Sequence, residues 1–187
     1  RLDLDRDLDL VHSWMNDPEV ARFWQKPWAR HRIASYLRRQ QGSDHLAPYL
    51  GLLDGVPIRY GELYRADLDP LAEYYAAHER DAGMHMLLGP PPCRGRGLGI
   101  DLLQTVSAWQ LEADSRATRV VAEPDVENAR VIRALEGAGF RRITDLDLPN
   151  KRAALMVRDR EGMSTSVRAA KREANGPEPT TEDGRLC

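Results

Sequence analysis

The stretch MHMLLGPPPCRGRGLGIDLL, residues 84–103, decides the fold of this chain. It begins with a short apolar run that suits a strand, and Gly89 with three prolines ends that run. Glycines at positions 95, 97 and 99 then precede a segment with Leu102, Val106 and Trp109 at helical spacing. Glycines at a helix start let backbone N–H groups approach an anion, and the helix dipole adds to the attraction. The stretch therefore predicts a strand, a loop and a helix, with phosphate or pyrophosphate as the loop's ligand. A plain strand–turn–helix junction is the alternative.

Two well-known phosphate loops do not fit this spacing. A P-loop needs Gly-Lys-Ser/Thr at the helix start, and the dinucleotide fingerprint is G-x-G-x-x-G. The pattern that fits is R-x-x-G-x-G, formed by Arg94, Gly97 and Gly99. It resembles the pyrophosphate loop of the GNAT superfamily of CoA-dependent acyltransferases. Residues 128–140, NARVIRALEGAGF, follow a predicted strand at 118–122 and are similar to the next motif of that superfamily.

The resemblance implies an α/β domain with the GNAT fold over residues 1–160. Its sheet would be mixed and mostly antiparallel, with a parallel central strand pair splayed around the acyl-CoA site and helices flanking the sheet. The strand–helix–strand order around the loop independently predicts that parallel pair. Residue patterns further predict helices at 7–15, 29–41 and 128–138, and hairpin strands at 50–53 with 56–64 and at 141–148 with 153–158.

Three segments have less regular patterns. The start of residues 2–9 alternates apolar and acidic side chains, which is typical of an edge strand. Residues 19–28 are predicted to be irregular, with Phe23, Trp24 and Trp28 either lining a pocket or closing one side of the core. Residues 161–187 contain too few apolar side chains to offset the entropy of ordering them, which predicts a disordered tail.

Composition and net charge narrow the classes of function that the chain can have. The chain has 187 residues, a net charge of −2 and an isoelectric point near 6.2, which argues against nucleic-acid and membrane-surface partners. It contains no apolar run of membrane-spanning length and no signal-peptide pattern. Because the first residue is Arg1 rather than Met, the question whether a leader sequence is missing stays open. Cys93 and Cys187 have no metal-ligand spacing, and we expect no disulfide between them. We expect no metal, a cytoplasmic location, and a monomer or weak homodimer.

Two residues are candidates for chemistry. His85 is the only His in a predicted strand, its strand leads into the loop, and imidazole exchanges protons near neutral pH. The alternative is that His85 is a buried core histidine whose ring nitrogens are satisfied by hydrogen bonds. Asp125 follows Pro124, which ends the parallel strand, and open sheets bind ligands at the carboxyl ends of parallel strands. For Asp125 and Asn128 the alternative is a cap or acid at the start of the next helix.

Within the superfamily, residues 8–158 resemble the siderophore acyltransferases. These are the aerobactin-type N-hydroxylysine acetyltransferases, the mycobactin lysine acyltransferase and the desferrioxamine-type N-hydroxydiamine acyltransferases. The matching stretches are PIRYGELY at 57–64, DAGMH at 81–85, AEPDVEN at 122–128, GF at 139–140 and LPNK at 148–151. The resemblance implies acyl transfer from acetyl-CoA, or another acyl-CoA such as succinyl-CoA, to a small N-hydroxylated diamine or lysine. Because Cys93 has no His at a recognisable spacing, we expect the transfer to be direct, without an acyl-enzyme. The product would be a hydroxamate, a bidentate ligand for iron.

The resemblance also implies roles for individual residues. It makes His85 the general base and Asp125 its partner or a substrate contact. At the position where many GNAT enzymes carry an acidic Tyr for the leaving thiolate, this chain has Leu135. The expected acyl-CoA contacts are Leu87, Leu88, Arg94, Gly95, Arg96, Gly97, Leu98, Gly99 and Asn128. The expected acceptor contacts are Trp24, Glu62, Tyr64, Asp81 and Lys151.

Two other functions stay open at this point. An aminoglycoside N-acetyltransferase shares the fold and motifs and would need an acidic cleft for its polycationic acceptor. Acidic side chains that could line such a cleft are Asp67, Asp69, Glu73, Glu79 and Asp81. A non-catalytic acyl-CoA-binding module would bind the coenzyme without turnover.

Overall fold

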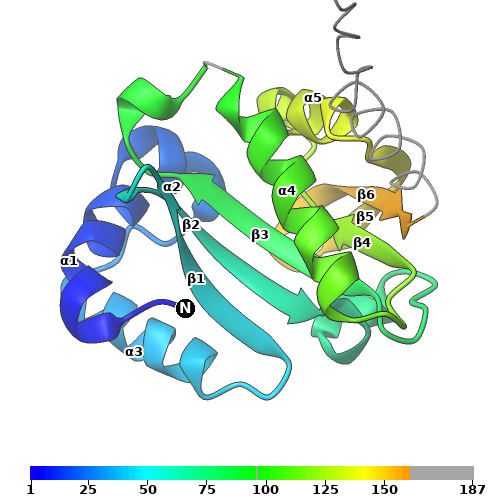
Figure 1. Cartoon of the computed structure of the whole chain (residues 1–187), viewed down its shortest axis with the longest axis horizontal. Helices are drawn as coiled ribbons and strands as arrows, with labels where there is room; N and C mark the ends of the chain where they lie inside the picture. Colours follow the sequence, from blue (N-terminus) through cyan, green and yellow to red (C-terminus); the bar gives the residue numbers. More distant parts are fainter. Residues whose placement is uncertain (96, 161–187) are drawn as a thin grey trace, which may run out of the picture.

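The centre of the molecule is a six-stranded mixed sheet, seen in a computed structural model that describes residues 1–95 and 97–160 (Figure 1). The strand order is β1-β2-β3-β4-β6-β5. Neighbouring strands pair antiparallel except β3 and β4, which are parallel. This confirms the predicted sheet. The tail predicted at residues 161–187 lies outside the described residues. The strands are β1 Leu46–Leu53, β2 Val56–Arg65, β3 Ala82–Leu88, β4 Arg119–Ala122, β5 Arg141–Leu148 and β6 Lys151–Asp159.

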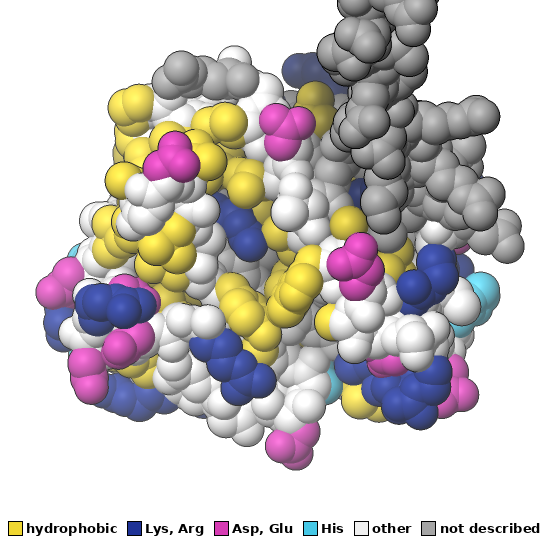
Figure 2. All heavy atoms as spheres, viewed as in Figure 1, with side chains coloured by type: hydrophobic (Ala, Val, Ile, Leu, Met, Phe, Trp, Pro, Cys, Tyr) yellow, Lys and Arg dark blue, Asp and Glu magenta, His cyan; other side chains and the backbone are white. Residues whose placement is uncertain are grey.

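Helices cover both faces of the sheet. On one face lie α1 (Leu4–Met15), α2 (Pro18–Trp24) and α3 (Arg30–Gln41), whose apolar side chains pack with Tyr60 and Leu87. On the other face lie α4 (Leu98–Ala113) and α5 (Ala129–Gly137), which pack around strand residues of the opposite pleat. Figure 2 shows hydrophobic side chains gathered beside α4 on this second face. Within the described ranges, no helix combines the length and apolar character needed to cross a bilayer.

The edge strand expected at the start of residues 2–9 is wrong. This segment belongs to α1, because the Asp3 side chain accepts the N–H groups of Asp5 and Arg6 and so caps a helix that starts at Leu4. The same residues that alternate along an extended chain also place Leu8 and later apolar residues on one helical face. Only Leu2 bonds to the sheet, through its N–H to the Pro48 carbonyl at 3.1 Å.

The irregular segment expected at residues 19–28 is also partly wrong. Its first half forms α2, which starts with Pro18 and is capped by the Asp17 side chain on the N–H of Glu19. Gln25 adopts a left-handed conformation, with φ of 56°, and ends the helix. A helix of seven residues is too short to show a clear apolar period, so the sequence pattern missed it.

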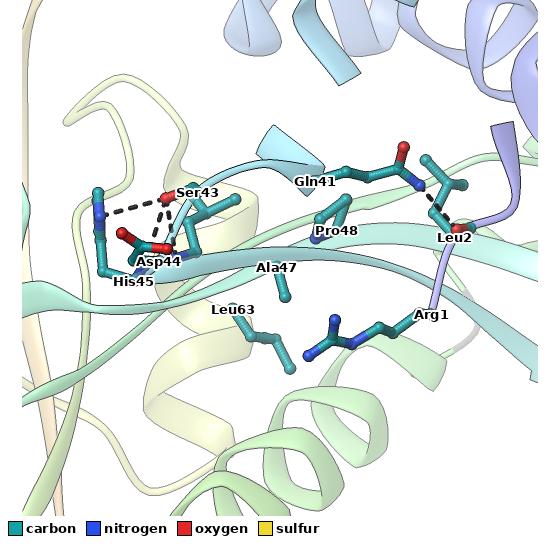
Figure 3. Close-up of a pocket in the computed structure, with 10 residues that line it drawn as sticks. Arg1, Leu2, Gln41, Ser43, Asp44, His45, Ala47, Pro48 and Leu63 are labelled. Atoms are coloured by element: carbon teal, nitrogen blue, oxygen red, sulfur yellow. Dashed lines mark hydrogen bonds between the residues drawn. The ribbon is translucent and has the colours of Figure 1, made fainter. Parts of the chain in front are cut away.

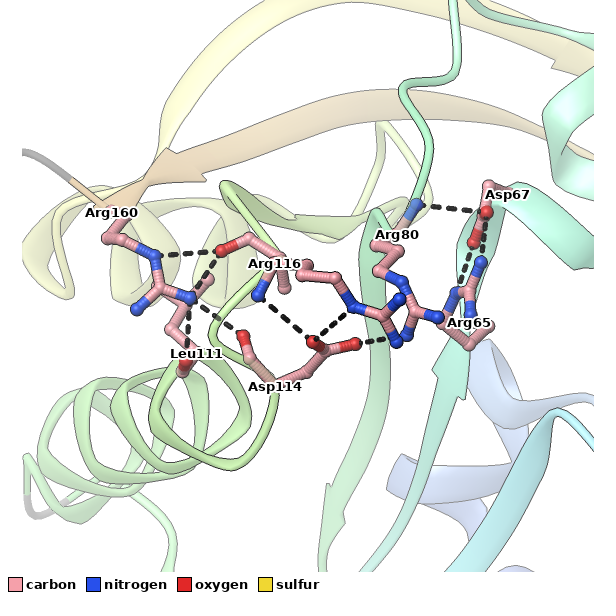
Figure 4. A network of polar contacts seen from close by, with 8 residues as sticks. Arg65, Asp67, Arg80, Leu111, Asp114, Arg116 and Arg160 are labelled. Atoms are coloured by element: carbon pink, nitrogen blue, oxygen red, sulfur yellow. Dashed lines mark hydrogen bonds and ion pairs between the residues drawn. The ribbon is translucent and has the colours of Figure 1, made fainter.

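Ion pairs anchor the long connection between β2 and β3 (Figure 4). Arg65 pairs with Asp67, whose carboxylate also accepts the N–H of Arg80 at 2.9 Å. The Arg80 guanidinium then pairs with Asp114 just after α4, at 2.7 Å. Arg160, after β6, donates to the carbonyls of Leu111 and Asp114 in the same corner. These contacts hold the start of β3 to the end of α4.

The parallel pair separates soon after it begins. β3 and β4 are paired only at Ala82 with Val120 and at Gly83 with Val121. β4 then ends at Ala122, whereas β3 continues to Leu88 with β2 as its partner on the other side. The second half of β3 therefore presents backbone groups toward a gap in the sheet, as the predicted splay requires.

Candidate active site

His85 lies between two carboxylates that come from different strands. It stands directly opposite Glu62 in the β2–β3 register, so the two side chains share one face of the sheet. The His85 Nδ1 lies 3.1 Å from Glu62 Oε2, and its Nε2 lies 2.6 Å from Glu123 Oε1. Glu123 follows the last residue of β4. The cluster of Glu62, His85 and Glu123, called the His85 cluster below, therefore spans the splay of the parallel pair.

Tyrosine hydroxyls satisfy the remaining oxygen atoms of the two carboxylates. Tyr36 from α3 and Tyr60 from β2 donate to Glu62 Oε1, the latter at 2.8 Å. Tyr64 donates to Glu123 Oε2 at 3.0 Å. The two glutamates are only 3% and 7% exposed, and burial without such partners would be costly. The buried carboxylates are thus held in fixed positions.

A glycine makes room for one of these tyrosines. A Cβ atom on Gly83 would lie 2.3 Å from the ring of Tyr64, which no real contact allows. Tyr64 and Gly83 stand opposite each other in the β2–β3 register. The absence of a side chain at this position lets the Tyr64 ring cross β3 and reach Glu123.

The charges of the cluster shift the pKa of its members strongly. Burial by itself lowers the pKa of His85, but Glu123 and Glu62 reverse this and raise it to about 10. Burial by itself raises the pKa of Glu123, but His85, Lys151 and Tyr64 lower it to about 2. At neutral pH the cluster is therefore an imidazolium between two carboxylates. Because both ring nitrogens contact a carboxylate, neither offers a free lone pair to a substrate.

Asp125 does not contact His85. Its Oδ1 accepts the N–H of Glu127 at 2.8 Å in the turn before α5, whose N-cap is Asn128 and not Asp125. Glu123, two residues earlier in the same E-P-D turn, is the carboxylate that meets the imidazole. Sequence reasoning missed Glu123, although its place immediately after the parallel strand is the signal that singled out Asp125.

Four of the five residues expected around the acceptor gather at the His85 cluster. Glu62 and Tyr64 belong to it as described, and the Trp24 ring lies edge-on to His85 with centroids 6.4 Å apart. Lys151, the first residue of β6, donates to the backbone carbonyl of Glu123 at 2.5 Å, and its Nζ lies 3.6 Å from Glu123 Oε1.

Asp81, the fifth, lies elsewhere. It is fully buried at the start of β3, pairs with Arg119 at 2.7 Å and accepts the hydroxyl of Tyr75 at 2.8 Å. Two of the five acidic residues considered for an aminoglycoside cleft are paired with arginines. Besides Asp81, Asp67 pairs with Arg65, and Asp69 caps the turn at Leu71.

The loop after β3 has the geometry of an anion site. Gly95 and Gly97 have φ of 76° and 83°, which favours glycine at both positions. Gly97 is the N-cap of α4 and supplies no side-chain oxygen, so no side chain caps the first N–H groups of this 16-residue helix. The β3 residues Leu87 and Leu88 lead into the loop, and Leu88 Cδ1 would lie 4.0 Å from a Cβ on Gly99.

Arg94, one of the expected coenzyme contacts, is held by partners within the protein. The Arg94 guanidinium pairs with Asp17 and Glu19 of the α2 start, each at 3.1 Å, and its Nε donates to the Leu88 carbonyl. It therefore fastens the loop to α2. Arg96 lies outside the described residues. Arg130 of α5, which sequence reasoning missed, points at the loop, because its Nη2 would lie 3.6 Å from a Cβ on Gly95.

Two further positions have structural roles. The Asn128 side chain caps α5 by accepting the N–H of Val131 at 3.3 Å, as the alternative interpretation of the sequence had it. Leu135, at the position where many GNAT enzymes carry a tyrosine, is 1% exposed and packs in the core between the sheet and α4. Cys93 lies in the turn Pro91–Cys93.

A pocket of about 290 Å³ lies apart from the His85 cluster (Figure 3). It is formed between the first two residues, the end of α3 and β1, with Gln41, His45 and Leu63 among its lining. None of the residues that contact His85 lines it. This pocket and the cluster of titratable groups are therefore separate features.

Sequence comparisons identify related proteins. The acetyltransferase (GNAT) domain family matches residues 3–148. The N(6)-hydroxylysine O-acetyltransferase of Escherichia coli is 35% identical over 86% of this chain and 51% of its own length. The lysine N-acyltransferase MbtK of Mycobacterium sp. (strain MCS) is 34% identical over 82% of this chain and 63% of its own length. The chain thus spans between half and two thirds of these two curated relatives.

Solved structures show the same architecture. An uncharacterized protein from Bacillus halodurans has a TM-score of 0.85 and 30% identity, covering 92% of this chain and 88% of that one. The aminoglycoside acetyltransferase AAC(6')-Ib in complex with coenzyme A and kanamycin has a TM-score of 0.78 and 26% identity, covering 89% and 97%.

Proposed function

Since this chain belongs to the GNAT acetyltransferase family, we propose that it transfers an acyl group from an acyl-CoA to the nitrogen of an N-hydroxylated lysine or diamine. Membership confirms the resemblance found at residues 94–99 and 128–140. The product would be a hydroxamate, as in siderophore biosynthesis. The observation that carries the proposal is the His85 cluster, which stands at the splay of β3 and β4, on the strand that leads into the glycine loop before α4.

The fit of an acyl-CoA rests on two features of the chain. The uncapped start of α4 and the left-handed glycines offer N–H groups to a diphosphate, with Arg130 close by. The unpaired side of β3 offers backbone groups to the amides of a pantetheine arm. The co-substrate supplies the activated acyl thioester. Acetyl-CoA and succinyl-CoA are both candidates.

Glu123, rather than His85, is proposed to take the acceptor's proton directly. A hydroxylamine nitrogen is a weaker base than an alkyl amine and is neutral at pH 7, so it needs no prior deprotonation. As the nitrogen bonds to the acyl carbon, its N–H becomes acidic enough for a carboxylate to accept the proton. The thiolate then leaves. His85 serves as a positioning residue that keeps Glu123 ionised and oriented.

Transfer is proposed to be direct, without an acyl-enzyme. Cys93 lies in the turn before the anion-binding loop, and the contacts of the His85 cluster come from Tyr, Trp and Lys side chains. A nucleophilic cysteine would need a base within hydrogen-bond reach. The two substrates would therefore meet in one complex.

Parallel assays with N-hydroxylysine, N-hydroxycadaverine and kanamycin test the proposal. The observation that favours an aminoglycoside instead is the structural similarity to AAC(6')-Ib. We expect coenzyme A release with at least one hydroxylamine, together with a ferric-hydroxamate absorbance, and little release with kanamycin. Faster turnover of kanamycin would overturn the proposal, and so would binding of acetyl-CoA and succinyl-CoA without turnover of any acceptor.

A further inference from the structure

Lys26 lies in an aromatic cage next to the His85 cluster. Its Nζ lies 5.7 Å from the ring centre of Trp24, 5.9 Å from that of Trp28 and 5.1 Å from that of Tyr36. These distances are within the range of cation–π attraction. Two of the rings join the cage to the cluster, because Trp24 lies edge-on to His85 and Tyr36 donates to Glu62.

The donors of this cage have no protein acceptors. Among residues 1–95 and 97–160, no oxygen atom lies within hydrogen-bond or ion-pair distance of Lys26 Nζ. The indole Nε1 of Trp24 is buried and also lacks a partner in the described part of the chain. The nearby carboxylates of Glu62 and Glu123 already accept from tyrosines and His85. The cage and the adjoining His85 cluster therefore have unused donors and few unused acceptors.

The charges around the cage and the His85 cluster also favour an anionic ligand. The basic side chains His85, Lys26 and Lys151 outnumber the acidic side chains Glu62 and Glu123, and Arg32 adds a further basic group against the outer cage ring of Trp28. An N-hydroxydiamine would bring another positive charge, because its far amine is an ammonium. An amino-acid acceptor brings a carboxylate as well, and a dicarboxylic acyl group brings a carboxylate alone. Either carboxylate would balance the surplus.

We propose that Lys26 and the Trp24 indole bind a substrate carboxylate, which makes carboxylate-bearing substrates the preferred class. This inference rests on the proposed acyl transfer and narrows its substrates. The carboxylate belongs either to an amino-acid acceptor or to a dicarboxylic acyl group. A charge-assisted hydrogen bond from a half-buried ammonium would orient that group beside the His85 cluster.

Two arms of one kinetic experiment distinguish the sources. The first compares N-hydroxylysine with N-hydroxycadaverine, using acetyl-CoA. The second compares succinyl-CoA with acetyl-CoA, using N-hydroxycadaverine. We expect a preference of roughly tenfold or more in kcat/KM for the carboxylate-bearing substrate in at least one arm. The arm with the preference identifies the source of the carboxylate.

Variants connect the preference to Lys26. In K26M, which keeps an apolar stem in the cage, the preference should fall by about tenfold, and in K26R part of it should return. R32M is the matched control, because the exposed Arg32 guanidinium lies 4.0 Å from the Trp28 ring and its loss removes the same charge. This control should keep the wild-type preference, and thermal melts should show that all variants are folded.

Two results would overturn the inference while leaving the proposed function intact. One is turnover without preference in either arm, and the other is a preference that K26M retains in full. Failure of the proposed function is distinguishable, because it gives no hydroxamate with any pair of substrates.

Discussion

At the scale of single residues, the position of one proton decides how the site works. The sequence suggested that His85 takes a proton from the substrate. The geometry of the site favours a His85 that is already protonated. Two carboxylates flank the ring, and their charges raise the pKa of His85 to about 10 although burial opposes this. The carboxylate of Glu123 is ionised at neutral pH and already accepts from His85 and Tyr64, and a carboxylate has lone pairs left to accept one further proton donor.

An NMR titration of His85 tests this assignment. Its ring carbon and nitrogen shifts should be those of an imidazolium at pH 7 and should change only near pH 10. In E123Q the ring loses its closest carboxylate, so the pKa of His85 should move down toward its ordinary value of 6.5. His31, which is exposed on α3, provides an internal control in the same spectra. An ordinary pKa for His85 in the wild-type protein would contradict the assignment.

At the scale of elements, the β3–α4 junction was predictable and its side-chain partners were not. The glycines at 95 and 97 need left-handed conformations, a local property that a short motif records. The partners of Arg94 lie more than seventy positions away, at the start of α2. That helix has seven residues and no clear period, so neither it nor its contact with Arg94 could be found from local patterns.

Arg130 and Arg133 provide a matched pair for the anion site. Both belong to α5 and both are exposed, but the Arg130 guanidinium lies against Gly95, where the structure places no contact of Arg133. If the loop binds a diphosphate, R130A should raise the Kd of coenzyme A by roughly tenfold, a typical effect of one charge-assisted contact. Isothermal titration calorimetry at low and physiological salt would measure this. Equal effects of R130A and R133A would indicate a diffuse attraction and not a contact at the loop.

At the scale of the whole molecule, the splay of β3 from β4 follows from long-range packing. The parallel pair, the flanking helices other than α2 and the final hairpin could be predicted, because each has a local period or turn signal. The pairing of only two positions between β3 and β4 depends on where β4 ends and on the α4 corner held by Asp114 and Arg80. The same holds for Glu123, which reaches His85 only because this fold brings the end of β4 beside the middle of β3.

The buried charges also predict how stability depends on pH. The raised pKa of His85 contributes stability that is complete below its unfolded value of 6.5 and is lost as pH rises through about 10. The lowered pKa of Glu123 contributes stability that is complete above its unfolded value of 4.5 and is lost as pH falls through about 2. The thermal midpoint should therefore be highest between these two unfolded values and fall on both sides. In an H85Q/E123Q double variant, scanning calorimetry should show a flatter profile, and an unchanged profile would contradict the account.

The turnover of E123Q, measured with saturating acyl-CoA and N-hydroxylysine from pH 6 to pH 10, tests the central role of Glu123 most directly. If this carboxylate takes the proton, kcat should fall by roughly a hundredfold or more across the range, while the Kd of coenzyme A stays close to that of the wild-type protein. If neutral His85 is the base instead, the same substitution would lower the pKa of His85 and raise the rate at pH 7. A rise in rate at pH 7 would contradict the account.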